Sequence, residues 1–282
     1  MRTIGGSRLM FVLLVAACSA GPDTTAPAAH SPESGLRPSF ILTTASCGDV
    51  IVSDLRLEHD LACAGDGLTV TGAGIQINLN GHTIAGAGAG VGIRVNASND
   101  VSIHGGIVRG FLQGMFVAAS TGIVIKDNEF TANGTAVLLQ ASSGNTIKDN
   151  VARQNTFRAF MIRPNIFGVV STSNDFVGNF LIDNPTGIFI ISQPGNTFTG
   201  NTISGSTVAA IDMSWPPGAS GNLIKGNLLT MSAAGIRFAA GWTGNTILGN
   251  TFLTNICAFL GPVVSNTLQG NTLTGNTTDF CP

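Results

Sequence analysis

The sequence predicts an all-β fold, a single-stranded right-handed parallel β-helix (a solenoid) of about nine to ten coils. Three observations support this prediction: a repeat near 22 residues, apolar columns at fixed places in the repeat, and asparagines at its turns. A repeat of this length with few helix-forming residues is typical of a solenoid. The repeat contains Asn-x-apolar-x-x-Asn, and its six copies are Asn145/Asn150, Asn174/Asn179, Asn196/Asn201, Asn222/Asn227, Asn245/Asn250 and Asn266/Asn271.

Three apolar columns predict three short strands in each coil. Apolar residues alternate with others along each segment, which is the pattern of a β-strand. Stacking each strand on its counterpart in the next coil gives three parallel sheets, and strand twist favours the right hand. The first column is Ile125, Ile147, Phe176, Phe198, Ile224, Ile247 and Leu268; the second is Phe130, Ala152, Leu181, Ile203, Leu229, Phe252 and Leu273; the third is Met115, Val137, Ala159, Ile188, Ile236, Phe259 and Phe280.

One asparagine recurs at the turn between the first and second strands. Stacked about 4.8 Å apart, amide side chains can bond to one another as a ladder, because each carries donors and an acceptor. The predicted ladder is Asn128, Asn150, Asn179, Asn201, Asn227, Asn250 and Asn271.

The chain divides into three regions. Residues 1–18 resemble a lipoprotein-type signal peptide, residues 19–40 read as a disordered tether rich in Ala, Pro, Ser and Thr, and residues 41–282 form the β-helix domain. The segment Val15-Ala16-Ala17-Cys18 resembles a bacterial lipobox, which implies lipid attachment at Cys18 and an outer-membrane or surface location. The alternative is ordinary cleavage after Ala20 and secretion.

Cysteine spacing predicts two disulfides. Setting Cys18 aside leaves four cysteines, an even number in an exported chain. Of the three pairings, Cys47–Cys63 with Cys257–Cys281 is favoured, since a solenoid brings only neighbouring coils together. Each bond would fasten one end, where a β-helix exposes an open sheet edge.

The segment Ile75-Gln-Ile-Asn-Leu-Asn-Gly-His-Thr-Ile84 carries a family resemblance. Together with the stretch from Cys47 to Gly86, it resembles the entry coils of bacterial right-handed β-helix repeat proteins. This group includes pectate-lyase-like enzymes and periplasmic NosD-type proteins associated with copper. The resemblance implies the fold and leaves the activity open, because most of these motifs are structural turns.

Composition and motif spacing limit the classes of partner and cofactor that the protein is expected to bind. A net charge of −2 argues against nucleic acid as a partner. No cofactor is indicated. A copper site would need His, Met or Cys at ligand spacing; His82 falls in a turn, His104 falls on a strand, and Met115 and Met161 fall in core columns. We therefore expect no metal site, and the oligomeric state is not readable.

Two long connections, residues 163–173 and 214–221, mark one face as a candidate binding site. Trp215 lies in the second connection and Trp242 in the matching turn one coil later. Exposed tryptophans would suit sugar rings; the alternative is that both cover the core. The candidate ligand-binding residues are Trp215, Trp242, Arg163, Lys148, Asp175 and Lys225.

Two further surface features bear on function. A basic line, His104-Lys126-Lys148, would receive an acidic polysaccharide or be merely a solvated face. An outward stripe of Phe116, Leu138, Phe160 and Phe189 would mark a partner surface or ligand groove, although a one-residue slip would bury it. Asp212 is expected to form an exposed ion pair with Arg237.

These features give three hypotheses. The first is an exported, lipid-anchored β-helix that binds carbohydrate or another surface polymer. The second is a pectate-lyase-like polysaccharide lyase or hydrolase, and the third is a structural or adhesive surface protein. Whether the chain is an enzyme stays uncertain, because the sequence displays no catalytic carboxylate cluster of the kind such chemistry needs.

Overall fold

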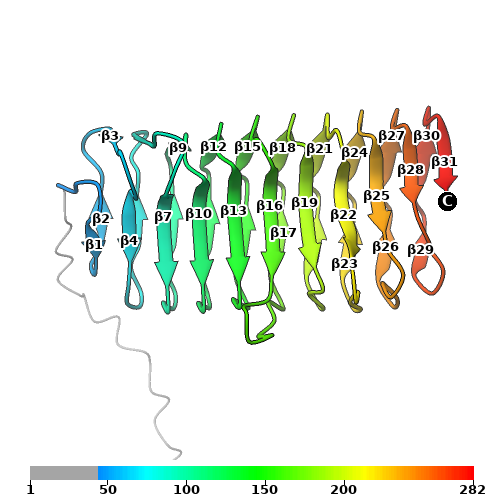
Figure 1. The fold of residues 1–282 in the computed structure, drawn as a ribbon, viewed down its shortest axis with the longest axis horizontal. Coiled ribbons are helices and arrows are strands. Elements are labelled where there is room, and N and C mark those ends of the chain that lie inside the picture. Colours follow the sequence, from blue (N-terminus) through cyan, green and yellow to red (C-terminus); the bar gives the residue numbers. More distant parts are fainter. Residues whose placement is uncertain (1–43) are drawn as a thin grey trace, which may run out of the picture. The chain divides into compact units, whose positions relative to one another are not determined.

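The computed structural model describes residues 44–282, and this part of the chain is a parallel β-helix without helices (Figure 1). Each coil runs through the first, second and third sheets in turn, and each strand pairs in parallel with its counterparts in the neighbouring coils. The fold class is therefore as predicted. The signal peptide, the tether, Cys18 and residues 41–43 lie outside the described residues. Within residues 44–282 no helix exists that would be long and apolar enough to cross a membrane.

The strands are short, two or three residues in the first two sheets and up to seven in the third. The first sheet contains β2 (Leu55–Arg56), β5 (Gln76–Asn78), β8 (Ser102–His104), β11 (Val124–Lys126), β14 (Thr146–Lys148), β17 (Asp175–Val177), β20 (Thr197–Thr199), β23 (Leu223–Lys225), β26 (Thr246–Leu248) and β29 (Thr267–Gln269). The second contains β3 (Leu61–Ala62), β6 (Thr83–Ala85), β9 (Ile107–Arg109), β12 (Glu129–Thr131), β15 (Val151–Arg153), β18 (Phe180–Ile182), β21 (Thr202–Ser204), β24 (Leu228–Thr230), β27 (Thr251–Leu253) and β30 (Thr272–Thr274). The third contains β1 (Val50–Ile51), β4 (Leu68–Val70), β7 (Val91–Asn96), β10 (Gln113–Ala118), β13 (Thr135–Gln140), β16 (Arg158–Arg163), β19 (Thr186–Ile191), β22 (Ala209–Trp215), β25 (Ala234–Phe238), β28 (Cys257–Leu260) and β31 (Thr278–Cys281).

The core is formed by the inward-facing residues of all three sheets. The first predicted column pairs in register along its length, for example Ile125 with Ile147 and Phe176 with Phe198. The second column does the same. Because side chains alternate between the two faces of a strand, these apolar residues are buried while their neighbours face outward. At the C-terminal end of the two columns Leu268 and Leu273 are partly buried and pack against the core.

The third column departs from its prediction in one coil. Val137 pairs with Phe160, so Phe160 faces the core and Ala159 does not take its place. The cause is the preceding turn: two residues separate Asn155 from Arg158, whereas only Gly134 separates Asn133 from the equivalent Thr135. One extra residue shifts the side-chain alternation by one position.

Stacked asparagines hold the corner between the first and second sheets, as predicted. In each link the amide oxygen of the next coil accepts the backbone N–H of the previous asparagine, as Asn150 does for Asn128 at 3.1 Å. The same bonds continue through Asn179, Asn201, Asn227, Asn250 and Asn271. Asp127 and Asp149 precede two of these asparagines with φ of 55°, a left-handed conformation that Asp tolerates better than most residues.

The other two corners carry ladders as well. The first asparagines of the repeat, Asn145 to Asn266, stack at the corner between the third and first sheets. At the corner between the second and third sheets, which the sequence reading missed, Asn133, Asn155 and Asn184 form one run, and Ser206, Ser232, Asn255 and Asn276 form another.

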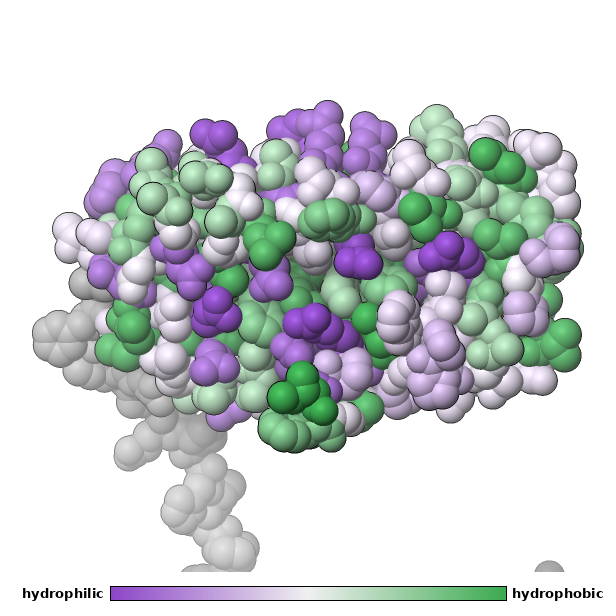
Figure 2. Space-filling view, viewed as in Figure 1, coloured by the Kyte–Doolittle hydropathy of each residue, from purple (hydrophilic) through white to green (hydrophobic). Residues whose placement is uncertain are grey.

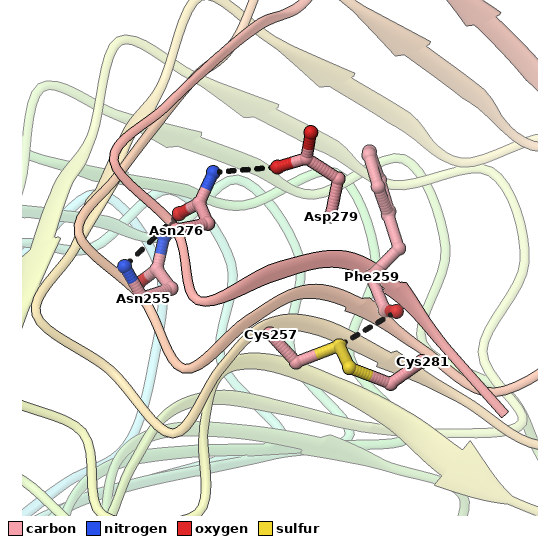
Figure 3. The surroundings of a disulfide bond; sticks show 6 residues. All are labelled: Asn255, Cys257, Phe259, Asn276, Asp279 and Cys281. Atoms are coloured by element: carbon pink, nitrogen blue, oxygen red, sulfur yellow. Dashed lines mark hydrogen bonds between the residues drawn. A yellow bond between two sulfur atoms is a disulfide. The ribbon is translucent and has the colours of Figure 1, made fainter.

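Both predicted disulfides are present, Cys47–Cys63 and Cys257–Cys281. Figure 3 shows the second, which joins β28 to the final strand β31 beside the end of the Asn255–Asn276 ladder. A bond that closes a loop with a sequence separation of 24 contributes about 3 kcal/mol by chain entropy.

Candidate functional site

The six predicted ligand residues do not form one cluster. Lys148, Asp175 and Lys225 lie on strands β14, β17 and β23 of the first sheet. Arg163 and Trp215 are the last residues of β16 and β22 in the third sheet. The set is therefore divided between two sheets, and only Trp215 lines the groove described below.

Of the two alternatives for Trp242, sugar stacking or covering the core, its burial favours the second, so Trp242 does not belong in the candidate ligand site. Its side chain is only 1% exposed and belongs to the hydrophobic core. Its indole N–H donates to the backbone carbonyl of Trp215 at 3.1 Å. Trp242 thus supports the backbone of Trp215, which is itself 53% exposed.

The outward apolar stripe is present, but one of its four residues differs from the prediction and most of its surface is covered. Because of the register shift, Met161 stands between Leu138 and Phe189 where Phe160 was predicted. Leu138, Met161 and Phe189 are each no more than 9% exposed, and Phe116 packs against them. Met161 is accordingly an outward residue and not a core one.

Two arginines cover this stripe. The guanidinium of Arg94 lies 5.4 Å from the ring centre of Phe116, and that of Arg158 lies 4.5 Å from the ring centre of Phe189. A guanidinium stacked on an aromatic face gains a cation–π attraction. Arg94 also forms an ion pair with Asp66 at 3.4 Å, which partly neutralises its charge, so Arg158 supplies most of the positive charge over the stripe.

A groove of about 400 Å³ opens where the stripe ends, across β16, β19, β22 and β25. Phe189, Asp212 and Arg237 lie along one outward column of its floor. The remaining lining residues are Thr156, Phe157, Arg158, Pro185, Thr186, Val208, Ser214 and Trp215.

Exposed aromatic side chains border the groove on two sides. Phe157, at the corner before β16, is 54% exposed. The Trp215 ring stands edge-on to Phe189, with ring centres 6.4 Å apart and an interplanar angle of 90°. Aromatic rings in these positions offer apolar faces to a bound ring system, and the Arg158 guanidinium lines the same groove.

The ion pair of Asp212 and Arg237 is buried on one side, contrary to the exposed pair that was predicted. The Asp212 side chain is 3% exposed and the Arg237 side chain 34%. The guanidinium binds in a bidentate manner, with Nε donating to Oδ1 at 3.1 Å and Nη2 donating to Oδ2. The backbone N–H of Ser214 also donates to Oδ1 at 3.0 Å. Both carboxylate oxygens are thus engaged within the protein.

Arg158 is the cation of the groove that carries no such pair. Among residues 44–282 no carboxylate forms an ion pair with Arg158. Burial lowers the pKa of its guanidinium, the charge of Asp212 opposes this shift, and that of Arg163 adds to it. An arginine stays protonated through such a change, so a desolvated positive charge lies in the groove.

The predicted basic line runs along the first sheet, away from the groove lining. His104, Lys126 and Lys148 stand in register on β8, β11 and β14. Burial and then the charge of Lys126 lower the pKa of His104, while Asp127 raises it. The line therefore presents two lysines and a histidine that is mostly neutral at pH 7.

Sequence reasoning overlooked Arg158 and Phe157. The available signal was the extra residue after Asn155, because a lengthened corner pushes its side chains out beyond the neighbouring coils. Arg158 is the first residue of β16, and this position lies outside the three apolar columns that were counted from the asparagines.

Comparison with known proteins now decides the family. The family model described as "Periplasmic copper-binding protein (NosD)" matches residues 59–259, most of the chain. The chain belongs to the NosD family. No curated protein matches the sequence of this NosD-family member.

Solved structures share its fold. An alginate lyase from Paenibacillus sp. str. FPU-7 has a TM-score of 0.65 at 16% identity, covering 81% of this chain and 91% of the lyase. The A-module of the Azotobacter vinelandii mannuronan C-5 epimerase AlgE6 has a TM-score of 0.58 at 13% identity, covering 83% and 80%. The Streptococcus pneumoniae surface protein and adhesin PfbA has a TM-score of 0.55 at 10% identity, covering 84% and 90%. At these identities the likeness establishes the fold alone.

The description of the NosD family names copper, a metal whose site would need suitable donor side chains gathered in one place. Within residues 44–282, His, Cys, Asp and Glu nowhere gather in groups of three. Both disulfides occupy the cysteines of this region, and His82 bonds to Asp60 at 3.1 Å. Copper in proteins prefers imidazole, thiolate and thioether ligands. These residues do not fit a copper centre.

Proposed function

We propose that this NosD-family chain is an exported, lipid-anchored β-helix that binds an acidic polysaccharide in the third-sheet groove. The observation that carries the proposal is the Arg158 guanidinium, which lies over Phe189 without a carboxylate partner and beside the exposed Trp215. A guanidinium binds carboxylates through paired hydrogen bonds, and an aromatic face suits the apolar face of a sugar. Uronic acid polymers combine both features.

The structural neighbours support this class of ligand. Two are named as an alginate lyase and a mannuronan epimerase, and these names refer to polysaccharides. The disulfides support export, since such bonds persist in oxidising compartments.

Binding without cleavage fits the groove better than hydrolysis or elimination. The carboxylate that lines the groove is Asp212, whose two oxygens accept bonds from Arg237 and from the backbone of Ser214. A general base must be able to reach a substrate proton. Asp212 instead orients Arg237, which adds a second guanidinium edge to the groove.

The first test measures affinity for alginate and polygalacturonate. We expect Arg158→Gln to weaken binding by tenfold to a hundredfold, because a hydrogen bond to a charged group contributes about 1.5–3 kcal/mol. Trp215→Ala should weaken it about tenfold, the scale of an aromatic contact. Titration calorimetry at low ionic strength measures both, and added salt should reduce the wild-type affinity.

Matched controls lie on the second sheet. Arg153→Gln removes an arginine that pairs with Glu129, and Phe180→Ala removes an aromatic ring that is 50% exposed. Neither should change the affinity. Equal affinities for wild type, Arg158→Gln and Trp215→Ala, with unchanged melting temperatures, would place the ligand elsewhere. Shortened polymer after incubation would instead favour the lyase or hydrolase alternative.

The lipid anchor has its own test. Val15-Ala16-Ala17-Cys18 supports acylation of Cys18. Mass spectrometry of membrane-extracted protein should find an N-terminal cysteine carrying acyl chains. A soluble chain that begins at Gly21 would contradict the anchor and leave the groove proposal untouched.

A further inference from the structure

The corner after β16 carries the two most exposed large apolar side chains of residues 44–282. Ile166 is 90% exposed and Phe167 is 84% exposed. They lie in the connection of residues 164–174, which projects from the lower edge in Figure 1 and ends in a strongly hydrophobic tip in Figure 2. Two neighbouring large apolar side chains at this exposure form a contiguous apolar protrusion, and contiguous apolar surface is the kind that marks an interaction site.

The tip is a hydrogen-bonded turn. Asn165 binds it at its base: its side-chain oxygen accepts the N–H groups of Phe167 at 3.0 Å and Val169 at 2.9 Å. Its backbone N–H donates to the carbonyl of Val169, and its carbonyl accepts the N–H of Gly168. Gly168 has φ of +79°, which closes the turn at little steric cost. The backbone N–H groups of Phe167, Gly168 and Val169 are therefore bonded inside the turn, which lowers the cost of moving this part of the backbone out of water.

The edge from which the tip projects is almost uncharged. Nine corners join the third sheet to the first between β4 and β29, and Asp100 is the single Asp, Glu, Lys or Arg among their residues. These corners are residues 71–75, 97–101, 119–123, 141–145, 164–174, 192–196, 216–222, 239–245 and 261–266. Val264, 77% exposed, adds another apolar side chain on this edge. An uncharged edge can approach lipid headgroups without a large desolvation penalty.

We propose that this edge rests on a lipid bilayer, with Ile166 and Phe167 inserted among the acyl chains. The length of chain before residue 44 permits it: from residue 18 to residue 44 the backbone reaches at most about 90 Å. The eleven strands of the third sheet, stacked about 4.8 Å apart, span roughly 50 Å. An anchor at Cys18 therefore leaves any point of this edge within reach of the same membrane. The inference rests on the proposed lipid anchor at Cys18, but it concerns a different surface from the polysaccharide groove and does not depend on that groove.

The test places a fluorophore at the tip of the full chain. Phe167→Cys is labelled with an environment-sensitive nitrobenzoxadiazole, and the protein is reconstituted in phosphatidylcholine vesicles. The four disulfide cysteines do not compete for the label, and Cys18 has no free thiol once its sulfur carries lipid, so the acylated chain is the one that is labelled. We expect a several-fold rise in emission and strong quenching by brominated acyl chains. The matched control is Met231→Cys, a 64% exposed apolar site at the corner between the second and third sheets, whose label should stay accessible to aqueous iodide.

A second variant tests the apolar contribution directly. Ile166→Ser in the labelled chain should reduce the ratio of inserted to free tip about tenfold or more, while the turn held by Asn165 stays formed. Quenching of the position-167 label by iodide to the same extent as the position-231 label would overturn the proposal. Protection from iodide without quenching by brominated lipid would overturn it too, because the tip would then be docked on protein, a second copy of this chain included.

Discussion

Replacing Asn201 with alanine should lower the free energy of unfolding by about 3–6 kcal/mol. The side chain is completely buried. Its oxygen accepts both the backbone and side-chain N–H groups of Asn179 at 2.9 Å, and its nitrogen donates to the carbonyl of Phe176 and to the amide oxygen of Asn227. Alanine leaves these partners buried without bonds, at about 1–3 kcal/mol each, in sums that are not additive.

Chemical denaturation followed by circular dichroism measures this loss. The matched control is Asn96→Ala, since Asn96 is exposed at the end of β7 and its change should stay within about 0.5 kcal/mol. A loss below about 1 kcal/mol for Asn201→Ala would mean that water replaces the amide in the ladder, and that the ladder is not what sets the stability of the corner.

Trp242→Ala should destabilise the protein by about 3–5 kcal/mol, the usual range when a large buried aromatic is truncated. The cavity would lie under the corner after β22, and the carbonyl of Trp215 would lose its donor. Trp215→Ala should cost far less stability, because that ring is about half exposed.

The two variants separate folding from binding when melting temperature and polysaccharide affinity are measured together. Trp242→Ala should lower the melting temperature, whereas Trp215→Ala should lower the affinity at nearly constant melting temperature. Equal thermal stability of the two variants would contradict the burial of Trp242 as a support of the core.

The coil architecture could be predicted from the sequence because the apolar and asparagine columns repeat in each coil. Asn128 and its successors are required in every coil by the same buried amide stack, so a single slot count finds them. The disulfides followed from the rule that only neighbouring coils touch. In both cases the contacting residues lie about one coil apart in the sequence, so the spacing alone identifies the contact.

The residues of the candidate site were harder to predict from the sequence, also because of the repeat. Its residues lie where the repeat breaks: the extra residue after Asn155 reversed the orientations of Phe160 and Met161 and placed Arg158 over Phe189. Trp215 ends β22 and Trp242 lies in the corner one coil later, yet the Trp242 ring is buried and the Trp215 ring is about half exposed. The third ladder escaped because serine replaces asparagine in two of its coils, Ser206 and Ser232.

Parallel stacking also determines how the molecule would respond to force. The hydrogen bonds between coils run along the solenoid axis. Tension applied to the two ends along that axis would therefore act on the bonds of the terminal coil first, and the coils would separate one after another. Each released coil would add about 75 Å of extended chain for its 22 or so residues. The Cys257–Cys281 bond closes the last coil covalently, so peeling from that end would have to begin deeper, at the coil before it.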